Sequence, residues 1–138
     1  MKFIFLLIAL NLFQAVQGFC FYNFNDEDFK VIQQWRNCIR NFGNRYQSGA
    51  IKKGGKSCCN YQNKDCVENQ QQDAIAWFEI STNCRGDKWA RNEYAMNLPA
   101  GGWMEFHGTK TDVEILAFWA NGTKFDYRQD INGSVTTE

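Results

Sequence analysis

Glu105 and His107 are the residues whose types and spacing come nearest to a catalytic pair, because they are two positions apart in the segment GGWMEFHG (101–108). In an extended strand, residues two apart point to the same face, so the carboxylate and the imidazole would lie side by side. Such a pair can transfer protons in a small hydrolase, but these enzymes usually need a second acid–base group. His107 is the only histidine in the chain. We therefore predict that His107 is an outward-facing histidine without a catalytic role. If the protein does have a catalytic site, Glu105 and His107 are its candidates.

The cysteines suggest a different chemistry. An even number of cysteines in an exported protein predicts disulfides, here three, with fifteen ways of pairing them. Zinc sites need Cys-x2-Cys pairs or matching clusters of cysteine and histidine, and the spacing CC-x6-C offers neither. We therefore expect no metal and no other cofactor. The six residues are Cys20, Cys38, Cys58, Cys59, Cys66 and Cys84.

Cys58 and Cys59 are adjacent in the sequence. If their segment is extended, the two side chains point to opposite faces, so each would bond a different part of the chain. This short segment would then tie two pieces of structure together. Because Cys84 is the last cysteine, residues 85–138 must be held by packing alone.

The segment GAIKKGGKS (49–57) resembles a phosphate-binding loop but does not match the Walker A pattern. A Walker A loop is G-x-x-x-x-G-K-[ST], and its first glycine would fall at position 50, which is Ala50. The loop should also follow a buried strand, and the preceding residues are polar. We therefore interpret the Gly-Gly pair as a turn that leads into the strand carrying Cys58 and Cys59.

The first 18 residues, MKFIFLLIALNLFQAVQG, have the pattern of a secretory signal peptide: a positive Lys2, a short apolar run and small residues at the end. The apolar run breaks at Asn11 and is too short to cross a bilayer, which takes about 20 residues. We expect cleavage near Gly18–Phe19, export to the extracellular space, and a single cysteine-rich β domain over 19–138.

The charge balance argues against some partners. Removing Lys2 with the leader leaves 14 of the 15 basic residues against 15 acidic residues, and their signs are scattered along the chain. Nucleic acid as a partner calls for a basic stripe, so we expect none. Attraction to an anionic membrane surface is disfavoured for the same reason.

Residues 26–42 have the clearest helical period in the sequence. Asn25 could cap this helix, and three acidic residues would fall in its first turn. A competing interpretation makes FCFYNF (19–24) and FKVIQQW (29–35) two strands of a hairpin. The stripe favours the helix, since its apolar residues recur at helical spacing: Val31, Ile32, Trp35, Cys38, Ile39 and Phe42.

The rest of the chain, from residue 50 on, predicts strands and turns. Segments 73–81 and 101–108 alternate, with Phe78 and Ile80 on one face of the first and Met104 and Phe106 on one face of the second. Segment 112–127 is apolar on both faces up to Trp119, which is typical of a central or covered strand, and then contains the hairpin signal Asn-Gly. The predicted fold is therefore mainly β: a disulfide-stapled two-layer β-sandwich or curled antiparallel sheet, with one N-terminal helix.

The aromatic content is the most distinctive feature, with five Trp, five Tyr and twelve Phe. Trp35, Trp77 and Trp119 lie in apolar patterns and are predicted to be in the core. Trp89 lies in a polar segment, and Trp103 shares a strand face with the Glu–His pair. Exposed aromatic residues beside polar groups are common in binding surfaces. The predicted binding residues are Trp89, Tyr94, Trp103, Glu105 and His107.

Asn121-Gly-Thr and Asn132-Gly-Ser are N-glycosylation sequons, and both fall at predicted turns. Together these features favour a secreted, non-catalytic binding protein, either effector-like or a module that recognises carbohydrate or a cell-surface component. An alternative is a membrane-active β-sandwich toxin that resembles aegerolysins or actinoporins, in which the same aromatic residues would contact lipid headgroups. A second alternative is a small secreted hydrolase that uses His107 and Glu105.

Overall fold

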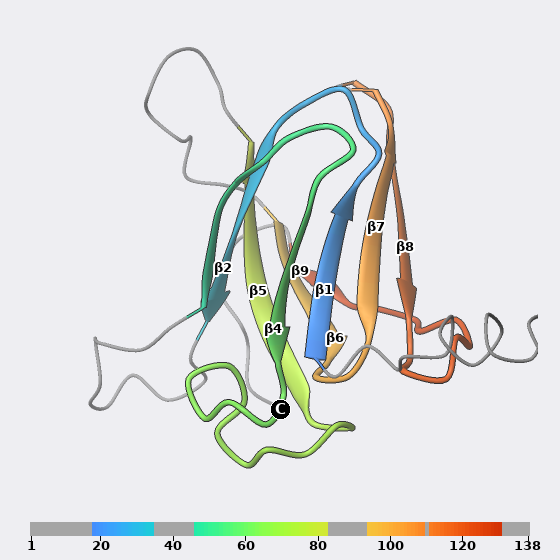
Figure 1. Ribbon diagram of the computed structural model, residues 1–138. Coiled ribbons are helices and arrows are strands. Elements are labelled where there is room, and N and C mark those ends of the chain that lie inside the picture. Colours follow the sequence, from blue (N-terminus) through green and yellow to red (C-terminus); the bar gives the residue numbers. More distant parts are fainter. Residues whose placement is uncertain (1–17, 35–45, 83–93, 110, 131–138) are drawn as a thin grey trace, which may run out of the picture.

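The structure is a computed structural model that describes residues 18–34, 46–82, 94–109 and 111–130 (Figure 1). The described residues form strands and connecting turns, without a helix. β1 begins one residue before the predicted cleavage point. The strands are β1 (Gly18–Asn23), β2 (Phe29–Gln34), β3 (Gln47–Ile51), β4 (Lys56–Asn60), β5 (Ile75–Thr82), β6 (Tyr94–Pro99), β7 (Trp103–Gly108), β8 (Val113–Phe118) and β9 (Gln129–Asp130).

The strands form two sheets that pack face to face, which confirms the predicted two-layer β architecture (Figure 1). Sheet A has the strand order β4-β1-β7-β8, and sheet B has the order β3-β2-β5-β6-β9. All neighbouring strands are antiparallel except β1 and β7, which run parallel. This parallel pair is the one departure from antiparallel pairing among the described strands. The reason is that β1 and β7 are far apart in the sequence, so no hairpin turn sets their relative direction.

The core between the sheets follows from the period-2 alternation of each strand. Phe19 and Phe21 of β1 point inward and meet Phe78 of β5, with ring centroids 4.8 Å and 4.9 Å apart in edge-to-face contact. The alternation predicted for β5 and β7 is confirmed. The largest fully buried apolar side chains are Phe19, Phe21, Val31, Phe78, Met96, Leu98 and Met104.

The predicted helix over 26–42 is wrong in its described part. Residues 29–34 form β2, which pairs with β3 on one side and β5 on the other. Pairing on both sides satisfies the backbone of this segment, and this tertiary arrangement overrides its helical spacing. The competing interpretation was right that both segments are strands, but β1 and β2 belong to different sheets. Residues 35–42 lie outside the described residues.

β8 is an edge strand of sheet A, so the first of the two predicted placements, central or covered, is wrong. Its outward apolar side chains belong instead to the surface described below. The predicted Asn121-Gly122 turn is present: Gly122 has φ 86°, and the Trp119 N–H donates to the Thr123 carbonyl over 2.9 Å. The returning chain makes only a single bridge, between Phe118 and Lys124.

Two disulfides are present among the described residues, Cys20–Cys58 and Cys59–Cys66. The first joins β1 to β4, and the second joins β4 to the loop that follows it. The prediction that Cys58 and Cys59 hold different parts of the chain is confirmed. Closing a loop of 38 residues with a disulfide stabilises a fold by about 3–4 kcal/mol in the chain-entropy picture. Cys38 and Cys84 lie outside the described residues, so the third bond stays a prediction.

Tyr46 closes the gap between the sheets beside β4. Its ring contacts Phe19 at a centroid distance of 5.0 Å, and its hydroxyl donates to the Ser57 hydroxyl over 2.6 Å. Burial raises the pKa of Tyr46, because a phenolate would lose its hydration there; the hydrogen bond with Ser57 acts in the opposite direction. The phenol is therefore held in its neutral form.

Candidate functional site

Side chains from three neighbouring strands form one outward surface on sheet A. The strand register places Trp103 of β7 between Cys20 of β1 and Phe118 of β8. One step along, Glu105 lies between Tyr22 and Leu116. Because strand residues alternate between the two sides of a sheet, these side chains point away from the core. We call the surface the aromatic face, and it consists of Tyr22, Phe24, Trp103, Glu105, His107, Leu116 and Phe118.

Glu105 lies at the centre of the aromatic face and binds both of its neighbours on β7. The Trp103 indole Nε1–H donates to Glu105 Oε1 over 3.0 Å, and His107 Nε2 lies 2.9 Å from Glu105 Oε2. The side chains of His107 and Glu105 are 34% and 25% exposed. With one contact on each oxygen, the carboxylate is fixed in orientation, and it fixes the indole and the imidazole in turn.

Aromatic rings extend from this centre in both directions. On one side Phe24 stacks on the His107 ring with centroids 4.8 Å apart, and Tyr22 stacks on Phe24 at 6.3 Å. On the other side Trp103 stacks on Phe118 at 4.8 Å. Phe24 is 48% exposed, which is unusual for a large apolar side chain and leaves ring surface available for a partner.

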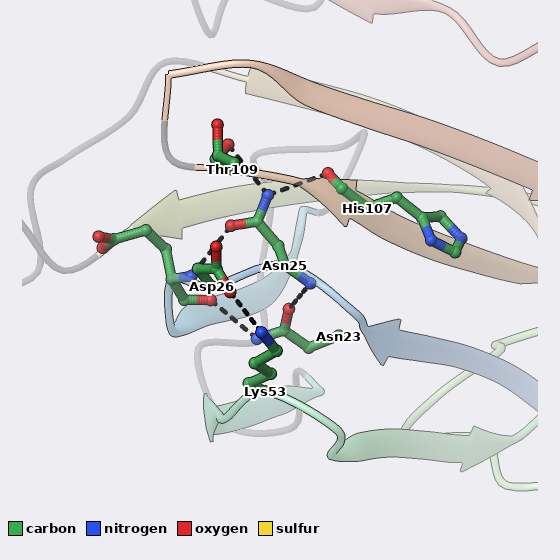
Figure 2. A network of polar contacts seen from close by, with 7 residues as sticks. Asn23, Asn25, Asp26, Lys53, His107 and Thr109 are labelled. Atoms are coloured by element: carbon green, nitrogen blue, oxygen red, sulfur yellow. Dashed lines mark hydrogen bonds and ion pairs between the residues drawn. The ribbon is translucent and has the colours of Figure 1, made fainter.

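A buried asparagine holds the end of β7 in place (Figure 2). The Asn25 Nδ2 group donates to the backbone carbonyls of His107 and Thr109, over 2.9 Å and 3.1 Å, and its Oδ1 accepts from the Glu27 N–H. Asn25 is 3% exposed. Asn25, a possible cap of the predicted helix, instead joins the β1–β2 connection to the strand that carries His107.

A second buried asparagine, Asn23, completes this network. Its Nδ2 group donates to the carbonyls of Glu27 and Ile51, both over 2.8 Å, and its Oδ1 accepts from the Asn25 N–H. An exposed ion pair between Asp26 and Lys53 lies beside it (Figure 2). Since both donors and one acceptor of Asn23 are used within the fold, we interpret the network as structural support for the aromatic face and not as a ligand site.

The structure unites three of the five predicted binding residues: Trp103, Glu105 and His107. The structure does not bring Tyr94 to the aromatic face: this residue begins β6 in the other sheet, where it pairs with Ile80. Trp89 lies outside the described residues.

Three aromatic members of the face were not among the predicted binding residues: Tyr22, Phe24 and Phe118. The alternation of FCFYNF places Cys20, Tyr22 and Phe24 on one side of β1 and was a usable signal for two of them. The placement of β1 beside β7 was not readable from the sequence, because the two strands pair across a long stretch of chain.

The acidic groups around His107 bear on the hydrolase alternative. Glu114 on β8 is the register partner of His107, and directly opposed residues in a sheet have Cβ atoms about 5 Å apart. Of the two acidic residues, Glu105 contacts the imidazole and Glu114 is its exposed cross-strand neighbour. No group of three or more His, Cys, Asp or Glu side chains suited to a metal occurs within 18–34, 46–82, 94–109 and 111–130.

In comparisons with known proteins, the chain matches no family model, no curated protein and no solved structure. No helix in the described part of the chain is long and apolar enough to span a bilayer.

Proposed function

We propose that the protein is a secreted, non-catalytic recognition module that binds carbohydrate or another cell-surface component through the aromatic face. The observation that carries this proposal is the arrangement of the rings: Tyr22, Phe24, Trp103 and Phe118 share one outward surface with a fixed carboxylate at its centre. The effector-like role predicted from the sequence is one biological setting for such a module.

The chemistry of the face suits a sugar ring. A pyranose has flat patches of C–H groups that lose unfavourable contact with water when they stack on an aromatic ring. Its hydroxyls need hydrogen-bond acceptors at the rim of that contact. A carboxylate has about four acceptor positions, and Glu105 uses two of them for Trp103 and His107, so it retains capacity for hydroxyl donors.

Secretion and glycosylation belong to the same proposal. They are supported by the leader-like residues 1–18, by the disulfides Cys20–Cys58 and Cys59–Cys66, and by the sequons at Asn121 and Asn132. Stable disulfides are typical of oxidising compartments. Asn121 is exposed at its turn, and Asn132 lies outside the described residues.

The test is a glycan array followed by calorimetric titration of the best glycan. We expect Trp103→Ala and Phe24→Ala to weaken binding at least tenfold, because each removes ring surface from the face. Ile75→Ala is the matched control, since Ile75 is a similarly exposed apolar residue on sheet B, 42% against 48% for Phe24. Equal affinity of the unsubstituted protein and all three variants for the glycan would disprove the proposed site.

A small hydrolase remains a second candidate, favoured by the 2.9 Å contact between His107 and Glu105 and by Glu114 opposite His107. If the pair transfers protons, His107→Ala should abolish cleavage of RNA or polysaccharide by the purified protein. Any cleavage that survives this substitution would come from another source and would remove His107 and Glu105 from the catalytic assignment.

A further inference from the structure

The Asn121 sequon lies directly against the aromatic face. The turn that carries it follows β8 and is closed by the Gly122 N–H, which donates to the Trp119 carbonyl over 2.9 Å. A side chain built at Gly122 would have its Cβ 3.8 Å from Cη2 of Trp103. The Trp103 indole therefore links two groups: its N–H is bonded to Glu105, and its benzene edge lies beside the sequon turn.

The local geometry leaves the Asn121 amide nitrogen accessible. Asn121 Oδ1 accepts from the Thr123 N–H over 3.0 Å and from the Thr123 hydroxyl over 2.7 Å. Asn121 is exposed, and its Nδ2 has no hydrogen-bond partner among the described residues. Nδ2 is the atom that an oligosaccharyl transferase modifies, so its position decides where a glycan begins.

We propose that an N-linked glycan on Asn121 folds back onto Trp103 and covers this end of the aromatic face, so that modification of Asn121 controls how much of the face an external ligand can use. In the modification, Nδ2 attacks the anomeric carbon of a lipid-diphosphate-linked oligosaccharide. A C–N bond forms, the C–O bond to the diphosphate breaks, the lipid diphosphate leaves with the electron pair, and one Nδ2 proton passes to a base of the transferase.

The physical reason for the fold-back is the tether. A free sugar stacks on an exposed indole only weakly, but a short covalent link raises its effective concentration to the millimolar range. A group that stacks on the native state alone also stabilises that state against unfolding. Trp103 accepts such a stack because Phe118 already holds its ring and the Glu105 carboxylate holds its N–H.

The inference rests on the proposed secretion and glycosylation, and its test needs no external ligand. The chain is produced in a glycosylating eukaryotic host with Asn132→Gln, so that only Asn121 can be modified, and occupancy is measured by mass spectrometry. The glycosylated protein is compared with its Asn121→Gln variant. We expect the glycan to raise Tm by about 2–6 °C. Nuclear Overhauser contacts should join its first sugar to the Trp103 indole.

The same glycan is then examined in a Trp103→Ala background, where its effect on Tm should fall to near zero; comparing shifts within each background removes the cost of the substitution itself. If Trp103→Ala does not fold, Trp103→Leu takes its place. An unmodified Asn121, or an equal Tm shift with and without Trp103, would overturn the inference. A Trp103-dependent shift, together with no binding of any external glycan by the unmodified Asn121→Gln protein, would instead refute only the proposed function.

Discussion

The outer faces of sheets A and B are built by the same alternation of side chains, but they differ in what reaches solvent. On sheet A, Tyr22, Glu105 and His107 are partly exposed and Phe24 is open. On sheet B, the outward positions of β6 are buried, with Ala95 1% and Asn97 8% exposed and Pro99 fully buried, whereas Ile75 on the neighbouring β5 is 42% exposed. An alternating sequence pattern therefore identifies which positions point outward, but it does not show which of them a ligand can reach.

The two faces also differ in whether their buried or half-buried indole N–H groups have hydrogen-bond partners. On sheet A, the Trp103 N–H is bound by Glu105. On sheet B, the Trp77 N–H is buried and has no hydrogen-bond partner within the described residues. Because the Trp103 indole is fixed beside a carboxylate on a half-exposed surface, we propose sheet A, and not sheet B, as the recognition surface.

The largest effect is expected when a charge is introduced at an outward position of each sheet. The two substitutions are Ala95→Glu on sheet B and Leu116→Glu on sheet A, and they compare the burial of these positions. Each new carboxylate would lie opposite a glutamate, Glu79 or Glu105. We expect Ala95→Glu to lower the free energy of unfolding by about 3 kcal/mol or more, because it buries a charge. Leu116→Glu should cost about 1 kcal/mol. Urea unfolding measures both, and equal costs would show that the two faces do not differ in burial.

A smaller effect is expected at Asn25, which supports only the sheet A side of the comparison. Asn25→Ala leaves the His107 and Thr109 carbonyls without their donor, which should cost about 2 kcal/mol. Asn63 is an exposed asparagine whose Oδ1 accepts from the Asp65 N–H, and Asn63→Ala should cost well under 1 kcal/mol.

The NMR signals of the His107 imidazole, the chain's only histidine, report on the position of that ring and do not change with stability alone. We expect them to shift in Asn25→Ala and to stay in place in Asn63→Ala. Unchanged imidazole signals in Asn25→Ala would mean that this asparagine does not position His107.

The smallest effect concerns Tyr46, which lies between the sheets and belongs to neither outer face. The pKa of Tyr46 is raised by burial, so above pH 10 the unfolded chain releases the phenol proton before the folded chain does, and stability falls as pH rises. Tyr46→Phe should cost about 1 kcal/mol at neutral pH through the lost bond to Ser57, and this difference should shrink above pH 10. Urea unfolding at pH 7 and pH 10.5 tests this; a constant difference would contradict it.

The sequence was sufficient for features that depend on one strand at a time. Glu105 and His107 are neighbours because they are two apart on β7, and the buried positions of β5 follow from alternation in the same way. Cys58 and Cys59 point to different bonding partners for the same local reason. These predictions needed only strand geometry.

The predictions that failed depend on pairing between distant segments. β2 is a strand because β3 and β5 are available on either side, whereas its own residues have helical spacing. Tyr22 and Phe24 were missed as members of the aromatic face because nothing local indicates that β1 pairs with β7. Non-local contacts of this kind outweigh local propensity in sheets.

The position of β1 between β4 and β7 also has a consequence for how the protein is made. During synthesis β1 and β4 leave the ribosome close together, but β7 follows β1 only after roughly 80 further residues. Sheet A therefore cannot be completed until most of the chain has been translated. The Cys20–Cys58 bond needs only the chain up to β4, so an oxidase acting on the nascent chain could join β1 to β4 before β7 is made. The other edge of β1 would stay unpaired until β7 and β8 are translated.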